Sequence, residues 1–369
     1  MNWQYKNPVS IQAGVGALDG LPGLLGKRRA WLIMFPEAES LGLAARLREM
    51  LGSQIVDEEL DVKANPDVEW VAPLYERLWQ RAPEAEVVIA LGGGSSIDCA
   101  KALVTRASSG HFDELLAFIR DGSDAAVFPR HGHKPLIAIP TTAGTGSEVT
   151  PCATLWDARQ GAKHSLHLPW TWPEAALIDP ELMLTLPAST TLASELDALS
   201  HALKSLWNVN RNPVSAALAV SAARAILRTL QALMASPASI DLREQLAVAA
   251  LEAGLAFSNT KTALAHSLSY AITLDHGVPH GIACSFSLPT VMALAIGWHE
   301  ALDADLCAIF DVERAADAVP CLARFLAQLN VSTNPSDYGI GPENWDARIK
   351  QALEGPRGRN FIAHDARVD

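Results

Sequence analysis

The first half of the chain alternates short apolar runs with stretches of helical periodicity. Apolar runs predict buried strands at 30–35 (AWLIMF), 87–91 (VVIAL) and 135–139 (PLIAI). Residues 41–51 place apolar side chains three and four positions apart, a pattern typical of an amphipathic helix. Strands separated by helices of this length predict a wound parallel sheet, in which ligands bind beyond the carboxyl ends of the strands.

The second half is rich in alanine and leucine, with a period near that of an α-helix. It predicts helices at 190–209, 213–235, 240–273, 280–297, 300–310 and 312–329. Few strands are expected after Ile178, which places a domain boundary near 186–187. The expected fold class is α/β plus all-α: a wound parallel-sheet domain at 1–187, followed by a helical domain at 188–369.

Composition excludes several classes of protein. The chain has 369 residues, 49% of them hydrophobic and 19% charged, which is typical of two compact globular domains. The formal net charge of −12 argues against nucleic acid as a partner. The five cysteines are scattered and form no CxxC pair, which argues against a disulfide scaffold and a cysteine-type zinc site. Without a signal pattern or a bilayer-spanning apolar run, we expect a cytoplasmic protein with no membrane partner.

A run of glycines follows the strand expected at 87–91. Gly92, Gly93, Gly94 and Ser95 lead directly into a helical stretch. Glycines let a backbone approach an anion closely, and a helix N-terminus offers free N–H groups and a favourable dipole. The run therefore predicts a pyrophosphate site. A purely structural turn is the alternative, because the run is not the GxGxxG fingerprint.

The strand expected at 135–139 leads into a loop of small and hydroxylated residues. Its hydroxyl groups, from Thr141, Thr142, Thr145 and Ser147, can bind ribose or phosphate oxygens. An ordinary polar turn is the alternative for this loop alone. Because it follows the next predicted strand, we expect both loops at one edge of the sheet, where they would form a nucleotide site.

The helical half holds candidate metal ligands. Asp197 and His201 are four residues apart and share a helix face, as either a metal-binding or a hydrogen-bonded pair. His266 lies in an apolar helix, and His276 and His280 flank a Gly-Val-Pro sequence. Spacing leaves the choice between the last two open. One carboxylate with two or three imidazoles, and no thiolate, suits a divalent ion such as Fe(II) or Zn(II).

Taken together, these residues resemble the iron-containing (group III) alcohol dehydrogenases. The resemblance runs from about Tyr5 to the 288–292 region. It rests on the glycine run with Asp98 and Lys101, the 141–148 loop, Ile178-Asp179-Pro180-Glu181-Leu182, the segment from Asp197 to Ala202, and His280-Gly281.

The resemblance implies a dehydroquinate synthase-like fold whose active site lies between a nucleotide-binding domain and a helical domain. It implies Asp197, His201, His266 and His280 as metal ligands, which makes His276 the less expected choice. It also implies NAD or NADP at the glycine run and at Thr141, Thr142 and Ser147, with Asp98, Thr145, Lys163 and Leu182 completing the cofactor site.

The sequence departs from the family pattern at several positions. Tyr270 stands where many members have a second histidine, so the proton route is assigned to either Tyr270 or His276. No clear acidic residue other than Glu37 follows the first strand, which leaves NADP use open. Lys204 replaces a glutamate common among relatives.

The stretch 258–270, with Ser258-Asn259-Thr260-Lys261-Thr262 and Ala265-His266-Ser267-Leu268-Ser269-Tyr270, resembles the branch that interconverts 2-hydroxyethylphosphonate and phosphonoacetaldehyde. We expect a basic, polar wall for a dianionic substrate, formed by Lys204, Asn208, Arg211, Asn259 and Lys261. A solvated helix face is the alternative for these side chains.

The predicted function is metal-dependent hydride transfer between NAD(P) and a small primary alcohol or aldehyde. Alternatives are a metal-dependent lyase of the dehydroquinate synthase type, a maleylacetate reductase-like enzyme and a non-enzymatic cofactor-binding protein. A homodimer is expected only from the fold.

Overall fold

The computed structural model describes residues 2–121, 128–129, 131–355 and 357–365. The chain forms two compact units. The sheet unit comprises Asn7–Thr142 and Ser147–Met183, and the helical unit comprises Met1–Lys6, Ala143–Gly146 and Leu184–Asp369. The long segment of the helical unit begins at Leu184, and two short earlier segments, Met1–Lys6 and Ala143–Gly146, group with it.

The packing of two glycines explains why 143–146 groups with the helical unit. A Cβ on Gly144 would meet the backbone of Ser194, and one on Gly146 would lie 2.6 Å from the α-carbon of Gly254. Both glycines thus allow the loop to press against helices of this unit.

The sheet unit is built on six parallel strands in the order β1-β8-β5-β4-β2-β3. Their bounds are β1 Ser10–Ala13, β2 Ala30–Met34, β3 Ile55–Glu59, β4 Val87–Gly92, β5 Leu136–Pro140 and β8 Ala175–Ile178. A separate antiparallel hairpin joins β6 (Cys152–Asp157) to β7 (Ala162–His167). The helices are α1 Leu21–Leu25, α2 Leu43–Leu51, α3 Val68–Glu76, α4 Gly94–Val104 and α5 Phe112–Asp121.

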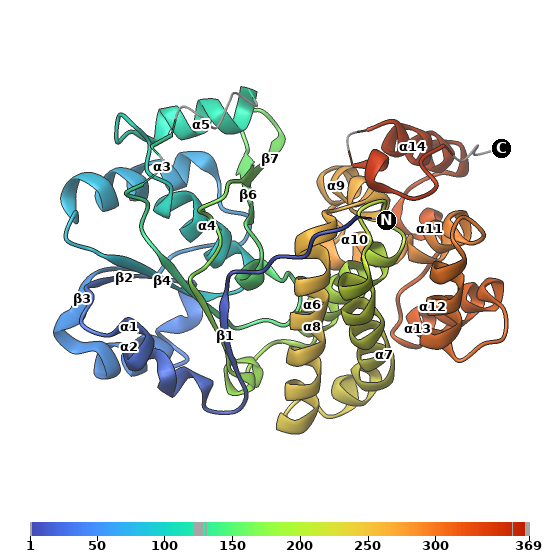
Figure 1. The fold of residues 1–369 in the computed structure, drawn as a ribbon, viewed down its shortest axis with the longest axis horizontal. Coiled ribbons are helices and arrows are strands. Elements are labelled where there is room, and N and C mark those ends of the chain that lie inside the picture. Colours follow the sequence, from blue (N-terminus) through green and yellow to red (C-terminus); the bar gives the residue numbers. More distant parts are fainter. Residues whose placement is uncertain (1, 122–127, 130, 356, 366–369) are drawn as a thin grey trace. The chain divides into compact units, whose positions relative to one another are not determined.

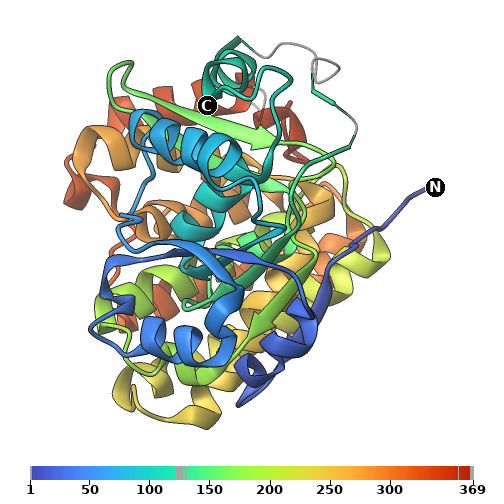
Figure 2. The same ribbon diagram turned by 90° about the vertical axis from the view of Figure 1, so that its left-hand side faces the viewer.

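Alternate side chains of the central strands enter two separate cores. Trp31 and Ile33 of β2 pack with α3, α4 and α5, whereas Leu32 and Met34 pack with α1 and α2. This is the period-two alternation of a strand that is buried on both faces. Figure 1 shows the two helical layers of this unit, and in Figure 2 α3 and the α1–α2 segment lie on opposite sides of the blue strands.

The helical unit contains nine α-helices among the described residues. They are α6 Ala188–Leu206, α7 Pro213–Ala235, α8 Ile240–Thr260, α9 Leu264–His276, α10 His280–Ser285, α11 Leu288–Ala295, α12 Glu300–Phe310, α13 Ala318–Gln328 and α14 Pro342–Glu354. The bounds of α7 and α12 agree with the sequence prediction.

Two predicted helices are each interrupted in the structure, and the helix expected at 312–329 begins only at Ala318. The helix expected at 240–273 ends at Thr260, because Lys261 adopts a positive φ of 69° with an extended ψ of 178°, and a new helix begins at Leu264. The helix expected at 280–297 is two helices that divide after Ser285. The first break places His266 in the opening turn of α9 rather than in the middle of a long helix.

The helix α7 is long and apolar enough to cross a membrane by length and composition alone, in contrast to the sequence expectation. It packs against α6 and α8 in the helical unit, and the side chains of Ala219, Ala223 and Leu230 are fully buried. The buried part of its apolar surface, 39% of its apolar stretch, therefore belongs to the core of this unit.

Candidate active site

The helix α6 carries a buried carboxylate and a buried imidazole one turn apart. His201 Nε2 lies 3.5 Å from Asp197 Oδ1. His201 Nδ1 lies 3.2 Å from the carbonyl oxygen of Gly144. A carbonyl can only accept a hydrogen bond, so Nδ1 carries the proton and the Nε2 lone pair faces Asp197.

Two further imidazoles approach the same carboxylate from other helices. His266, at the start of α9, places Nε2 3.4 Å from Asp197 Oδ1 and 3.0 Å from His201 Nε2. His280, the first residue of α10, places Nε2 4.0 Å from Asp197 Oδ1. The four residues predicted as metal ligands therefore converge in the helical unit.

The separations between these atoms fit a shared metal ion. Ligands at about 2.1 Å from one ion lie about 3.0 Å apart at a right angle and about 3.4 Å apart in a tetrahedron. The distances among Asp197, His201 and His266 span 3.0 to 3.5 Å. His280 lies slightly farther out, and a small side-chain shift would bring it into the same range.

Burial favours the metal-binding form of the His201 imidazole. Desolvation holds the pKa of His201 well below its usual value, and the nearby Lys204 ammonium lowers it further, against the opposing charge of Asp197. A neutral imidazole keeps the lone pair that a metal requires. The site is therefore prepared for a divalent cation.

Lys204 lies beside this cluster, although the sequence assigned it only to a substrate wall. Its side chain is fully buried, with Nζ 3.3 Å from His266 Nε2 and 4.3 Å from the ring centroid of Phe257. A buried ammonium this close to the candidate ligands provides a positive charge for an anionic group on a bound molecule.

Sequence reasoning missed Cys284. The ligand atoms of Asp197, His266, His280 and Cys284 all lie within 4.8 Å of one another. The structure thus adds a thiol to a ligand set expected to lack one. Its spacing, four residues after His280, was the available signal, since such residues share a helix face.

The two candidate proton-transfer residues differ in their surroundings. Tyr270 stacks on His280, with ring centroids 5.9 Å apart, and the guanidinium carbon of Arg357 lies 4.5 Å from the Tyr270 centroid. His276 is exposed, with Nε2 3.5 Å from Arg348 Nη2. Arg357 follows the region of family resemblance, so no motif indicated it.

Three of the remaining residues of the expected substrate wall have hydrogen-bond or ion-pair partners of their own. Arg211 pairs with Asp305 of α12. Asn259 exchanges hydrogen bonds with the backbone of Lys6. Asn208 donates to the carbonyl oxygen of Lys261, and the Lys261 side chain is exposed. Of the five residues, the structure places Lys204 beside the candidate metal ligands.

In the sheet unit, the two polar loops lie side by side. Gly92 of β4 pairs in register with Pro140 of β5, and Thr141 N donates to the carbonyl oxygen of Gly92. A Cβ on Gly93, which immediately precedes Gly94 and Ser95 in α4, would lie 3.3 Å from Thr142 Oγ1. Both loops thus occupy the carboxyl ends of neighbouring parallel strands.

A buried lysine fixes the end of the second loop. Lys101 Nζ donates to Ser147 O at 2.6 Å, Ser147 Oγ at 2.7 Å and Cys152 O at 2.6 Å. Asp98 accepts from Ser147 Oγ at 2.6 Å and from Thr154 N at 2.8 Å. Burial lowers the pKa of Lys101 and raises that of Asp98. Asp98 therefore serves this network, which anchors Ser147.

The other residues expected at the cofactor lie on β7, in the apolar core and in the 143–146 segment. Lys163, on β7, lies 5.1 Å from the ring centroid of Trp156. Leu182 is buried in the core beside α1 and α2. Thr145 belongs to the segment that groups with the helical unit.

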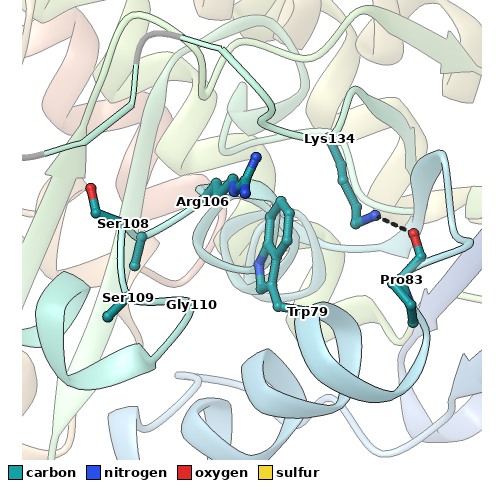
Figure 3. Close-up of a pocket in the computed structure, with 8 residues that line it drawn as sticks. Trp79, Pro83, Arg106, Ser108, Ser109, Gly110 and Lys134 are labelled. Carbon is teal, nitrogen blue, oxygen red and sulfur yellow. Dashed lines mark hydrogen bonds between the residues drawn. The ribbon is translucent and has the colours of Figure 1, made fainter.

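A pocket of about 320 Å³ lies elsewhere in the sheet unit. Figure 3 shows the Trp79 indole between the side chains of Arg106 and Lys134. Pro83 and Lys134 precede β4 and β5 in the chain, so the pocket is at the amino ends of these strands. The glycine run is at the opposite, carboxyl ends.

Comparison with known proteins identifies the family. The model for "Iron-containing alcohol dehydrogenase" matches residues 8–180, and the model for the "Fe-containing alcohol dehydrogenase family, C-terminal" matches residues 191–364. The chain belongs to the iron-containing alcohol dehydrogenase family. It is accordingly an oxidoreductase of the iron-type alcohol dehydrogenase class.

Similar members of this alcohol dehydrogenase family include reductases of anionic aldehydes. Sulfoacetaldehyde reductase of Bilophila wadsworthia is 27% identical, over 97% of this chain and 94% of that protein. Phosphonoacetaldehyde reductase of Streptomyces viridochromogenes is 36% identical, over 59% of this chain and 55% of that protein. The structure of sulfoacetaldehyde reductase from Bifidobacterium kashiwanohense with NAD+ superposes with a TM-score of 0.88, at 28% identity, covering 99% and 96% of the two chains.

Proposed function

We propose that this alcohol dehydrogenase reduces a small aldehyde carrying a phosphonate or sulfonate group, using NAD(P)H and a divalent metal, and catalyses the reverse oxidation of the alcohol. The convergence of Asp197 Oδ1 with the Nε2 atoms of His201, His266 and His280 carries the proposal. These side chains would hold the ion, either Fe(II) or Zn(II).

When bound, the metal would polarise the substrate carbonyl and the nicotinamide would supply the hydride. Gly92, Gly93 and the N-terminus of α4 would bind the cofactor pyrophosphate through backbone N–H groups. Thr141 and Thr142 would contact the ribose or nicotinamide, and Lys101 would keep Ser147 in position beside them. The protein thereby orients the cofactor, and this orientation is a large part of its contribution to the rate.

Tyr270 is the proposed proton-transfer residue. Its ring stacks on His280, whereas His276 is exposed beside Arg348. A phenol can donate a proton to the forming alkoxide and recover it from solvent. The alcohol oxygen gains this proton while the carbonyl carbon gains the hydride, which balances the reduction.

The anionic substrate class is proposed from Lys204. A buried ammonium 3.3 Å from His266 Nε2 supplies a positive charge where a substrate held by the metal would extend. An anionic tail would neutralise that charge, and a charged hydrogen bond of this kind contributes roughly 1.5–3 kcal/mol. The 27% identical sulfoacetaldehyde reductase and the 36% identical phosphonoacetaldehyde reductase support the same class.

A NAD(P)H oxidation assay tests the proposal. Metal-loaded protein should oxidise NADH or NADPH with phosphonoacetaldehyde or sulfoacetaldehyde, and far less efficiently with propanal. Nucleotide binding without net oxidation by any aldehyde would reject the reductase and favour a lyase. His280→Ala should lose the metal and turnover yet still bind NAD(P). Full activity of metal-free His280→Ala would refute the ligand assignment.

Substitution of the cation tests the substrate class separately. Lys204→Met keeps the length of the side chain and removes its charge. It should lower kcat/KM for the anionic aldehyde by roughly 10- to 150-fold, the equivalent of a lost charged hydrogen bond. It should change kcat/KM for propanal much less. Lys261→Met, which removes an exposed lysine, is the matched control. Equal losses for both aldehydes would reject Lys204 as an anion-binding residue.

A further inference from the structure

The thiol of Cys284 points into the same cluster as the candidate metal ligands. Cys284 lies one turn after His280 on α10, and its side chain is fully buried. Its Sγ is 3.6 Å from His280 Nε2 and 3.9 Å from His280 Nδ1. Together with Asp197 and His266, these residues place four ligand atoms within 4.8 Å of one another.

Simple coordination geometry matches one of the two sulfur–nitrogen distances. A tetrahedral ion at about 2.3 Å from a thiolate and about 2.05 Å from an imidazole holds these two atoms about 3.6 Å apart. The observed separation of Cys284 Sγ and His280 Nε2 is 3.6 Å. An ion on His280 Nε2 would hold Sγ about 5 Å from Nδ1, against the observed 3.9 Å, so the imidazole must turn when the two side chains share an ion. The 3.4 Å between His266 Nε2 and Asp197 Oδ1 also matches a tetrahedral pair. A thiol hydrogen bond to His280 is the competing explanation of the first distance.

We propose that Cys284 is a further metal ligand. It gives the centre a tetrahedral Asp197, His266, His280 and Cys284 arrangement for a thiophilic ion such as Zn(II) or Co(II). The set with His201 in place of Cys284 serves a harder ion such as Fe(II). The inference rests on the proposed function only in requiring that this pocket hold a metal. As the metal–sulfur bond forms, the S–H bond breaks and its proton passes to solvent.

The softness of the thiolate ligand affects which metal ion the site prefers. Thiolates favour zinc and other soft ions, whereas carboxylates and imidazoles discriminate less among divalent metals. One thiolate and the Asp197 carboxylate also balance the two positive charges of the ion, which lowers the cost of burying it. Cys284 therefore sets which metal the protein retains when several are available.

Cobalt(II) is the probe for this ligand. Apoprotein, prepared with a chelator, is reloaded with Co(II), and its absorption spectrum is recorded. Wild-type protein should show a near-ultraviolet sulfur-to-cobalt charge-transfer band. Cys284→Ser should bind Co(II) without that band. Cys307→Ser, which changes a partly buried cysteine of α12, is the matched control and should keep it.

A metal competition and an independent spectrum complete the test. Cys284→Ser should weaken Zn(II) binding by roughly 10- to 100-fold, the loss seen even for groups that only support a ligand, and Fe(II) binding much less. X-ray absorption of zinc-loaded wild-type protein should show one sulfur at about 2.3 Å, which tests the ligand even where a variant fails to fold.

The outcomes separate this inference from the proposed function. Visible cobalt bands without charge transfer in wild-type protein, or zinc without a sulfur neighbour, would overturn the role of Cys284 and leave the metal centre intact. Failure of the wild-type protein to bind either ion would overturn both.

Discussion

Removal of the buried Lys101 ammonium should destabilise the nucleotide loop without affecting metal binding. Lys101→Met removes the donor to Ser147 O, Ser147 Oγ and Cys152 O, and leaves the Asp98 side chain, which is 17% exposed, without this cation. Loss of one member of a buried charged pair costs about 3–5 kcal/mol. Lys101 donates three short hydrogen bonds as a charged group, and their removal is consistent with a loss of folding free energy of that size.

Hydrogen exchange resolves the expected effect within the sheet unit. Amides of β6, which begins at Cys152, should exchange faster in Lys101→Met by an amount equivalent to at least about 3 kcal/mol of opening free energy. Affinity for NAD(P) should fall because Ser147 is no longer held, while metal content should stay unchanged. Lys63→Met, at a side chain that is 74% exposed, is the control and should change the exchange by less than about 0.5 kcal/mol.

A double substitution tests the charge argument directly. Asp98→Asn in the Lys101→Met background removes the uncompensated carboxylate. It should recover part of the loss, with an interaction energy of about 0.5–3 kcal/mol. A Lys101→Met protein with wild-type exchange and nucleotide affinity would refute the view that this lysine holds the loop.

Three further predictions concern individual residues. Burial raises the pKa of Glu148 from 4.5 to about 7, because the folded protein favours the protonated carboxyl group. The folded state is therefore most stable below pH 4.5, where this group is protonated, and it loses that stability as the pH rises through 7. Thermal unfolding of Glu148→Gln should therefore match wild type at pH 4.5 and show a gain of up to about 3 kcal/mol above pH 7, and equal curves at every pH would contradict this. A Cβ on Gly281 would collide with the carbonyl oxygen of Ala193, so Gly281→Ala should displace α10 and lower metal content, measured by mass spectrometry, at unchanged nucleotide affinity. Tyr270→Phe should reduce kcat by about 10²-fold and alter its pH profile, whereas His276→Asn should leave both close to wild type; the reverse result would assign the proton to His276.

The sequence predicts the central strands better than the edge strands. Buried strands such as β2 and β4 are continuous apolar runs, which a periodicity argument finds readily. The edge strands β1 (SIQA) and β3 (IVDEE) are partly exposed and carry polar residues, so they give little local signal. Their place is determined by pairing with β8 and β2, which is a tertiary interaction.

The candidate metal centre is predictable for a different reason. Asp197 and His201 are linked by helix periodicity, but nothing local links them to His266 or His280, and the family resemblance supplied that connection. Cys284 was available from its spacing to His280, yet the scattered cysteines, without a CxxC pair, argued against a thiol ligand. The break at Lys261 could not be foreseen, because a lysine gives no signal for a positive φ.

The course of the chain through Ala143–Gly146 means that the metal half of the protein cannot be isolated as one continuous fragment. The backbone passes from one unit to the other four times, and the carbonyl that orients His201 comes from Gly144. A fragment starting at Leu184 would carry all the ligands but lack the acceptor that fixes one of them. Domain exchange or gene splitting at Leu184 would therefore separate the metal ligands from Gly144, whose carbonyl oxygen orients His201.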